Sequence, residues 1–511
     1  MSDWTSGYVT DIGYTFGYYT ELNPVRVKLA FLNAGLVCPE SGTACELGFG
    51  QGISANIHAA ASLTHWYGTD FNPAQAGFAQ ELSAVSGGHA RLFDDTFAEF
   101  AQRTDLPEFD YIGLHGIWSW ISDKNRAVIV DFIRRKLKVG GVLYISYNTM
   151  PGWAAFAPIR HLMTEHAQVL GAKGTGIVGR INGALDFTDK LLATQPDYIK
   201  ANPQVADRIE SLKQQNRAYL AHEYFNSNWQ PMHFATMVQW LEPAKVGFAC
   251  SANYMEYTDA VNLTDEQQKL LKEIPDAMFC ESVRDFMVNQ QFRKDYWVKG
   301  GRKLNMLEKN EALGSQKILL TTPRSDIALK ITGSLGEAAL IESIYAPILD
   351  ALADYKPKTI AQLEQAIKAA NITSPQLVQA VMILTGAGHL AAVQDDSVVL
   401  KTKKQTDKLN AHLMAKARSG NDITVLASPV TGGGIAVGRF QQLFALALQQ
   451  GKKKPDEWAA FVWQIISIQG QKILKEGKTL ETAEENLSEL TAQAHMFAAK
   501  QLPILKALQI V

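Results

Sequence analysis

Short apolar segments alternate with longer amphipathic segments over the first 150 residues, and each apolar segment ends at a polar or glycine-rich turn. Short apolar runs bounded by turns are typical of buried strands, whereas the longer segments carry a helical repeat. Strands that alternate with helices predict a doubly wound α/β fold, in which ligands bind at the carboxyl ends of parallel strands. The strands expected after the first are residues 66–70, 90–93, 109–114 and 142–147, with helices at 53–61 and 125–137.

From residue 154 onward the alternation gives way to helices alone, which predicts an insertion that serves as a lid or a dimerisation element. A helix at 232–241 and a strand at 246–255 then look like the closing pieces of the same sheet. The helices expected in the insertion are 158–170, 177–194 and 204–220, with breaks at 171–176 and at Asn202-Pro203. The domain boundaries that follow are 1–153 with 218–260 for the first domain, 154–217 for the insertion and 261–314 for a connecting region.

Residues 315–511 form a third, mainly helical region, for which we predict an interaction domain. Helices at 341–355, 359–370 and 374–384, followed by a hairpin at 390–400, predict a winged-helix-like part at 338–400. Its third helix contains no Arg or Lys for reading base edges, which argues against DNA binding. Further on, residues 431–434 are expected to form a turn between a strand at 422–428 and a helix at 438–448. Truncation near Ser315 is therefore expected to spare the first domain.

The loop after the first expected strand has glycine at every second position, Gly48, Gly50 and Gly52, and Glu46 lies two residues ahead of it. Glycine allows sharp turns and close approach to a ligand because it has no Cβ. A dinucleotide fingerprint would need its third glycine at position 53, which is Ile53. An acid ahead of the loop suits a cationic ligand better than a pyrophosphate, so the loop predicts a site for S-adenosylmethionine.

Carboxylates also follow the next two strands. Asp70 ends the second strand, where a carboxylate can accept hydrogen bonds from both ribose hydroxyls. Asp94 and Asp95 end the third strand, where a carboxylate can accept from the adenine amino group. Phe71 and Thr96 adjoin these positions and are expected to contact the cofactor as well.

The methyl acceptor is expected beyond the fourth and fifth strands, which end at His115 and at Tyr147-Asn148. Aromatic faces near these ends can hold an ammonium or a partly methylated amine by cation–π attraction. A lysine acceptor must first lose its proton, which a desolvated pocket favours. The catalytic candidates are His115, which also borders the cofactor, Trp118, Tyr147 and Asn148, with Trp120 and Trp153 as further aromatic faces.

Composition narrows the class of protein. The chain has 511 residues, 47% of them hydrophobic, and a formal charge of −2, which predicts no general attraction to nucleic acid or to anionic membranes. Its four cysteines show no metal-ligand spacing and indicate a reducing compartment, and the histidines form no cluster, so we expect no metal. Neither a secretory signal nor a membrane-spanning run is visible, so we expect no membrane insertion and a cytoplasmic location.

Three further blocks resemble a known family. The blocks are His115–Trp120, Ser146–Trp153 and Tyr219–Phe225, and together with residues 1–153 they resemble class I S-adenosylmethionine-dependent methyltransferases with a methyltransferase regulatory domain. The resemblance implies a bacterial enzyme like the protein-lysine methyltransferases that act on outer-membrane proteins, with a protein substrate and an insertion used for regulation or for a homodimer. In a start that carries Tyr8, Tyr14, Tyr18 and Tyr19, Tyr14 is the tyrosine expected to cover the cofactor.

Three functions fit the residues. The first is methyl transfer to protein lysine, favoured by the aromatic acceptor side and by the resemblance. The second is methyl transfer to a small molecule, which the cofactor half would serve equally well. The third is a non-catalytic scaffold that binds S-adenosylmethionine. Methylation of nucleic-acid amino groups is disfavoured, because the fourth strand ends in Leu114-His115-Gly116 and not in an Asp/Asn-Pro-Pro-Tyr type sequence.

Overall fold

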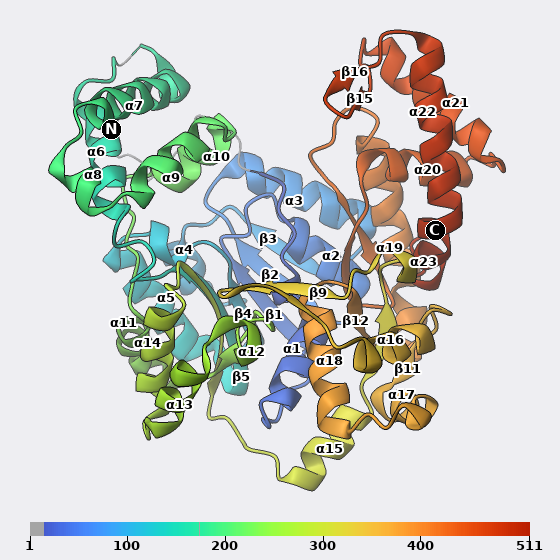
Figure 1. The fold of residues 1–511 in the computed structure, drawn as a ribbon, viewed down its shortest axis with the longest axis horizontal. Coiled ribbons are helices and arrows are strands. Elements are labelled where there is room, and N and C mark those ends of the chain that lie inside the picture. The colour runs from blue at the N-terminus through green and yellow to red at the C-terminus, as the bar shows by residue number, and fades with distance from the viewer. Residues whose placement is uncertain (1–14, 173) are drawn as a thin grey trace.

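A seven-stranded sheet lies at the centre of the computed structural model, which describes residues 15–172 and 174–511 (Figure 1). The strand order is β3-β2-β1-β4-β5-β7-β6. The first five strands pair in parallel, as the alternation of strands and helices predicts, and β7 runs antiparallel to both of its neighbours. The strands are β1 (Thr43–Leu47), β2 (His65–Thr69), β3 (Ala90–Phe93), β4 (Phe109–Leu114), β5 (Leu137–Asn148), β6 (Val246–Ser251) and β7 (Phe292–Lys299).

Strand β7 lies within residues 261–314, for which the sequence predicts only a connecting region. It pairs with β5 on one side and with β6 on the other, so the sheet extends past residue 260 and β6 does not itself pair with β5. The sequence hides this strand because three successive charged residues, 293–295, follow its first residue. Arg293 and Asp295 are nevertheless buried, since they form an ion pair with a separation of 3.0 Å.

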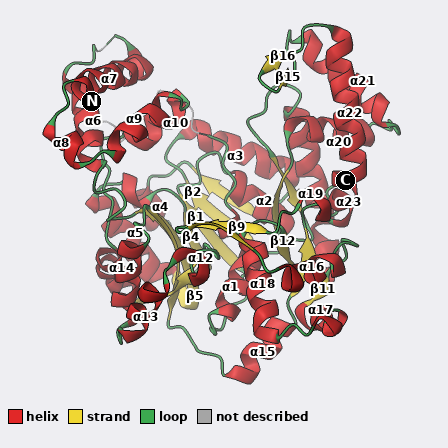
Figure 2. Ribbon diagram, in the orientation of Figure 1, coloured by secondary structure: helices red, strands yellow, loops and turns green. Residues whose placement is uncertain are grey.

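Helices cover both faces of the sheet (Figure 2). Side chains alternate along a strand, so Val142 and Tyr144 of β5 face one layer while Leu143 and Ile145 face the other. The first face packs against α1 (Pro24–Asn33), α2 (Ile53–Ala61) and α3 (Pro73–Ser86). The second face packs against α4 (Phe97–Gln102), α5 (Asp123–Lys136) and α11 (Phe234–Leu241).

The expected insertion consists of helices around a core of its own. That core includes Trp153, Phe156 and Tyr224, and these helices form the teal and green group at the upper left of Figure 1. The helix expected at 204–220 is interrupted before Asn216, whose side chain caps the start of a separate helix. The helices are α6 (Ala157–Val169), α7 (Gly176–Ala193), α8 (Asp197–Ala201), α9 (Gln204–Lys213) and α10 (Arg217–Tyr224).

The winged-helix prediction is confirmed only for its three helices. The strand β12 (Leu390–Val393) does not turn into a hairpin around Asp395, because α19 (Asp396–Lys416) begins there with Asp396 in its first turn. An acidic residue in that position favours a helix start. The partner of β12 is instead β8 (Lys317–Leu320). The helices of this part are α16 (Glu342–Ala351), α17 (Ile360–Ala366) and α18 (Ser374–Gly386).

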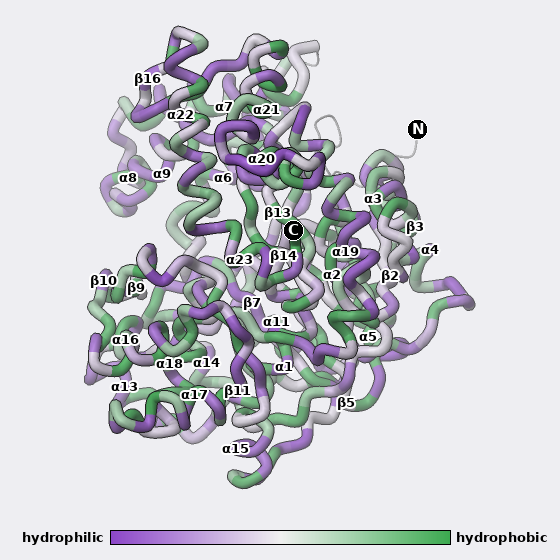
Figure 3. Tube along the Cα trace, turned by 90° about the vertical axis from the view of Figure 1, so that its right-hand side faces the viewer, coloured by the Kyte–Doolittle hydropathy of each residue, from purple (hydrophilic) through white to green (hydrophobic). Residues whose placement is uncertain are grey.

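The C-terminal region packs directly on α2. All nine residues of α2 are buried, because Ile53 and Ile57 join a core with the C-terminal residues while Ala55 and Ala59 join the sheet core. In Figure 3, α2 lies beside α19 and the hairpin of β13 (Val425–Ser428) and β14 (Gly433–Ala436). Residues 433–436, part of which was expected to form a turn, are therefore the second strand of this hairpin.

The remaining elements connect or extend these layers. The C-terminal helices form the red group at the upper right of Figure 1. The elements after β6 and in the C-terminal part are α12 (Asp259–Asn262), α13 (Asp265–Glu273), α14 (Ala277–Met287), α15 (Met306–Gly314), β9 (Lys330–Gly333), β10 (Gly336–Ala339), β11 (Lys358–Thr359), α20 (Arg439–Gln449), α21 (Pro455–Ile468), β15 (Leu474–Lys475), β16 (Lys478–Thr479), α22 (Ala483–Met496) and α23 (Leu502–Ala507).

Candidate active site

A cavity of about 320 Å³ lies at the carboxyl ends of the first four strands. The loops after these strands each contribute residues to its wall, as a doubly wound sheet predicts for a ligand site. Those residues are Gly48 and Gly50 after β1, Asp70 and Phe71 after β2, Asp95 and Thr96 after β3, and His115 after β4.

The glycine loop is shaped by backbone conformations that favour glycine. Gly48, Gly50 and Gly52 have φ angles of 73°, 58° and 68°, in the left-handed region. A Cβ on Gly48 would lie 2.4 Å from the Ile117 side chain, so this position has no room for one. A Cβ on Gly52 would meet Ala79 of α3 at 2.4 Å. Gly52 thus allows α2 and α3 to pack closely and lies outside the cavity wall.

Asp70 joins the second strand to the glycine loop. Its Oδ2 accepts a hydrogen bond from the Gly50 amide at 2.9 Å, and its Oδ1 accepts one from the Asn72 amide at 3.1 Å. Burial raises the pKa of this carboxyl to about 6, although both amides favour the charged form. The position matches the one expected for a residue that binds ribose.

Glu46 lies behind the loop, at the end of β1, and is not part of the cavity wall. It is buried, and among the described residues no donor reaches its Oε2. Burial, with a smaller contribution from the nearby Asp70 charge, raises the pKa of Glu46 to about 8. The carboxyl is therefore mostly protonated at neutral pH, and a positively charged group beside it would favour its ionised form.

The two neighbouring carboxylates that follow β3 lie in different surroundings. Asp95 and Thr96 reach the wall, whereas Asp94 is exposed and does not. Asp95 forms an ion pair with Arg103 at 3.1 Å. The Thr96 hydroxyl donates to Glu99 at 2.7 Å in the cap of α4. Both side chains are thus held by the protein before any ligand binds.

His115 and Tyr19 form the wall near the end of β4. Their rings stack with centroids 3.5 Å apart, and His115 Nδ1 lies 2.8 Å from the Tyr144 hydroxyl. Burial lowers the pKa of His115 to about 3, so the imidazole is neutral at physiological pH. The tyrosine in the wall is Tyr19, while Tyr14 lies outside the described residues.

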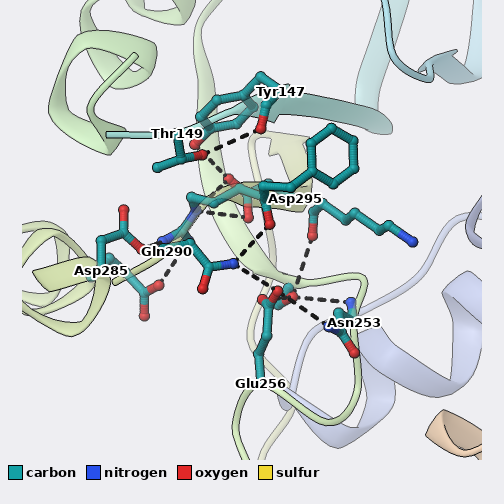
Figure 4. Close-up of polar contacts among 12 residues, drawn as sticks. Tyr147, Thr149, Asn253, Glu256, Asp285, Gln290 and Asp295 are labelled. Atoms are coloured by element: carbon teal, nitrogen blue, oxygen red, sulfur yellow. Dashed lines mark hydrogen bonds and ion pairs between the residues drawn. The ribbon is translucent and has the colours of Figure 1, made fainter. Parts of the chain in front are cut away.

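Three predicted acceptor-side residues are not in the wall. Trp118 is fully buried in the core, where its indole N–H donates to the Met232 sulfur at 3.3 Å. Tyr147 is also buried, and its hydroxyl donates to Asp295 at 2.8 Å (Figure 4). Asn148 lies at the buried end of β5, where its backbone amide donates to Ser119 Oγ at 2.8 Å. A strand end inside a seven-stranded sheet is covered by its neighbours, which sequence position alone does not reveal.

Of the two further aromatic faces, Trp120 lies in the cavity wall and Trp153 does not. Trp120 lines the cavity and is also near Trp229, with centroids 6.2 Å apart. The face of Trp153 is already occupied by the guanidinium of Arg208, 3.9 Å from the ring centroid. Its cation–π partner is therefore a residue of the protein itself.

Several wall residues carry no signal in the sequence. They come from the N-terminal segment, from α3 to α5 and from the loop after α10, and no motif connects these segments. They include Thr15, Gly17, Gln75, Phe97, Lys124, Asn125 and Asn228.

Two further features of residues 15–172 and 174–511 concern metal binding and membrane crossing. No group of three or more His, Cys, Asp or Glu residues there could hold a metal ion. None of the helices in that part of the chain has both the length and the apolar composition needed to cross a bilayer.

The sheet order and the glycine loop define a Rossmann-like methyltransferase fold, and the comparisons agree. The chain is 42% identical to the uncharacterized protein sll1526 of Synechocystis over 99% of both chains, and residues 216–299 match the model of a predicted methyltransferase regulatory domain. The chain therefore belongs to the family of sll1526, and within it residues 216–299 correspond to the methyltransferase regulatory domain. A second relative, the uncharacterized protein RP789 of Rickettsia prowazekii, is 24% identical over 60% of this chain and 56% of its own length.

A solved structure extends the likeness of fold over almost the whole chain. PKMT2 from Rickettsia typhi in complex with AdoHcy superposes with a TM-score of 0.69 at 18% identity, covering 95% of this chain and 98% of PKMT2. A second structure of PKMT2 from Rickettsia typhi gives a TM-score of 0.66. The C-terminal half is thus part of the shared architecture.

Proposed function

We propose that this protein transfers a methyl group from S-adenosylmethionine to lysine side chains of a protein substrate. The observation that carries the proposal is the meeting of the glycine loop, Asp70 and His115 around one cavity. The family supports the reaction class, and the fold shared with PKMT2, solved with AdoHcy, supports the cofactor and a protein substrate.

The residues present fit this cofactor. Asp70 would accept from the ribose hydroxyls, Asp95 and Thr96 would border the adenine, and Gly48 and Gly50 would allow close approach of the backbone. Glu46 lies behind the loop, and a cationic ligand nearby would favour the ionised form of its buried carboxyl, whose Oε2 has no hydrogen-bond partner among the described residues. When bound, S-adenosylmethionine supplies an activated methyl group, so the protein has mainly to align the acceptor and exclude water.

The acceptor would approach between Tyr19, His115 and Trp120. These three rings line the wall, and an aromatic surface lowers the pKa of an incoming lysine by desolvation. A neutral imidazole at His115 could accept a hydrogen bond from the amine, which is the role we assign to it. Trp118, Tyr147 and Asn148 would support this wall from behind without touching the substrate.

The helical insertion at 154–217 keeps its proposed role in regulation or dimerisation. It is connected to the cavity through aromatic contacts, because Trp229 lies between Trp120 and Trp153 with centroid distances of 6.2 Å and 5.0 Å. Residues 315–511 are proposed to dock the protein substrate.

The test uses tritiated S-adenosylmethionine and a lysate separated into protein, nucleic acid, lipid and small molecules. We expect label in the protein fraction that survives acid hydrolysis and elutes as methyl-lysine, and we expect Asp70→Ala to reduce it strongly at subsaturating cofactor. Label recovered as methyl-arginine, as base-labile ester or in small molecules would replace the lysine proposal. No label in any fraction, with a protein that binds the cofactor, would favour the scaffold.

A further inference from the structure

Residues 15–23 lie between the cavity and the C-terminal region, and we call them the strap. Thr15, Gly17 and Tyr19 line the cavity. The residues between them make contacts elsewhere: Phe16 packs edge-on against Phe78 of α3, with centroids 5.3 Å apart, and Tyr18 contacts the C-terminal hairpin. Alternate residues of an extended segment point in opposite directions. One face of the strap therefore lines the cavity, and the other packs against α3 and the C-terminal hairpin.

Tyr18 is bonded on that second face. Its hydroxyl lies 3.1 Å from Nε2 of His58 in α2 and also makes a hydrogen bond with the backbone of Gly434 in β14. Burial raises the pKa of the phenol well above its usual range and lowers the pKa of His58 to about 3. Both groups therefore stay neutral, and the hydrogen bonds persist across the physiological pH range. His58 is itself fully buried.

The hairpin is shaped to receive the strap. A Cβ on Gly433 would lie 2.5 Å from both the Tyr18 hydroxyl and the Asn23 amide nitrogen, and a Cβ on Gly434 would lie 2.9 Å from the Tyr18 ring. The Asn23 side chain donates to the Thr431 carbonyl in the hairpin turn at 3.0 Å. Two adjacent glycines thus leave the space that the strap fills, across more than 400 residues of sequence.

We propose that Tyr18 is a positioning residue for cofactor binding, through which the β13–β14 hairpin holds the strap over the cavity. The C-terminal region would then contribute to cofactor affinity without touching the cofactor. This inference rests on the proposed function for the identity of the ligand. Tyr18, Gly433 and Gly434 do not themselves line the cavity.

The test compares three variants of the full chain, with S-adenosylhomocysteine as the probe. Tyr18→Phe removes only the hydroxyl, and Gly433→Ala presses a methyl group against the strap. Gly77→Ala is the matched control, because it adds a methyl to an exposed glycine of α3 with no atom within 4 Å of the new carbon. Calorimetry gives the Kd and thermal unfolding without ligand gives the Tm. Initial rates give the KM for S-adenosylmethionine and kcat.

We expect the Kd and the KM for S-adenosylmethionine to rise about fivefold or more in Tyr18→Phe and Gly433→Ala, the loss typical of one or two neutral hydrogen bonds. Both variants should keep the wild-type kcat at saturating cofactor. The control Gly77→Ala should keep the wild-type Kd and KM. A lower Tm with an unchanged Kd in both variants would overturn the inference, because it would show a purely structural role. Failure of wild type itself to bind the probe would instead overturn the proposed function.

Discussion

The Asp70 carboxylate accepts a hydrogen bond from the Gly50 amide at 2.9 Å, so the end of β2 holds the glycine loop that follows β1. One side chain therefore shapes the cofactor loop and is available to bind the cofactor. This double role makes Asp70 the residue whose loss should affect ligand binding most.

We expect Asp70→Ala to weaken S-adenosylmethionine binding by roughly a hundredfold, about 2.7 kcal/mol, because charge-assisted hydrogen bonds to the ribose would be lost. Asp94→Ala is the matched control, since Asp94 is exposed and should have no effect. Calorimetry on both folded variants measures the difference. Equal affinities in Asp70→Ala and wild type would remove Asp70 from the site.

The raised pKa of Glu46 predicts how stability depends on pH. Since its pKa is about 8 in the folded protein and ordinarily about 4.5, the folded state binds more protons between these values. The contribution of protonated Glu46 to the free energy of unfolding is therefore fully present below pH 4.5. It is lost as the pH rises through 8. Glu46→Gln removes this loss, so we expect its Tm advantage over wild type, without cofactor, to be larger at pH 8.5 than at pH 5.

Differential scanning at the two pH values measures this advantage. The exposed Glu40 provides the control, because Glu40→Gln should shift the Tm equally at both. A pH-independent difference for Glu46→Gln would mean that the carboxyl is charged in the folded protein throughout this range.

Deleting residues 315–511 should destroy cofactor binding, which reverses the expectation from sequence that truncation near Ser315 would spare it. The reason is that Ile53 and Ile57 of α2, directly after the glycine loop, are buried against C-terminal residues. Removing that cover exposes apolar area worth about 25 cal/mol per Å². We expect fragment 1–314 to aggregate or to unfold without cooperativity. A fragment that melts cooperatively and binds S-adenosylhomocysteine like the full chain would contradict this.

Tyr147→Phe should lower stability and leave catalysis unchanged. The variant removes the hydrogen bond that Tyr147 donates to buried Asp295, and hydrogen bonds to charged groups contribute about 1.5–3 kcal/mol. If Tyr147 were the catalytic residue that the sequence suggests, kcat would fall instead. Denaturant unfolding and initial rates on the same preparation separate the two outcomes, and a loss of kcat in a protein of unchanged stability would restore Tyr147 to the site.

The sequence predicts most of the sheet because its first five strands obey local rules. The helix expected at 53–61 is α2, residue for residue, and the strands at 90–93 and 109–114 have the predicted bounds. Strand β7 was missed because Arg293 looks like a surface residue, whereas the structure buries it among Glu281, Asp285 and Asp295. Burial of a charge depends on partners distant in the sequence, which no local pattern contains.

In the candidate site, too, some residues can be predicted from local sequence and others depend on distant parts of the chain. Asp70 and the glycines are adjacent to strand ends and could be predicted from the parallel sheet alone. On the acceptor side, the choice among Trp118, Trp120 and Trp153 depends on which face of the loop turns inward and on where Arg208 packs. Both depend on tertiary packing. The sequence therefore predicts that the acceptor side lies near the ends of β4 and β5, and it does not predict which tryptophan faces the cavity.

The neutral state of His115 predicts the shape of the pH–rate profile. Burial lowers its pKa to about 3, so the imidazole does not titrate between pH 5 and 9 and cannot produce an inflection near 6.5. We expect an acidic limb of kcat/KM for S-adenosylmethionine near pH 6, where Asp70 becomes protonated and loses affinity for the ribose.

His115→Asn tests this assignment, because it keeps a polar group while removing the imidazole. We expect kcat to fall about tenfold, since the acceptor loses a hydrogen-bond partner, and the profile to keep its shape. An inflection near pH 6.5 in wild type that disappears in His115→Asn would show that the imidazole titrates during catalysis. His115 would then act as a general base exposed to water, and the stacking of Tyr19 on its ring could not persist during turnover.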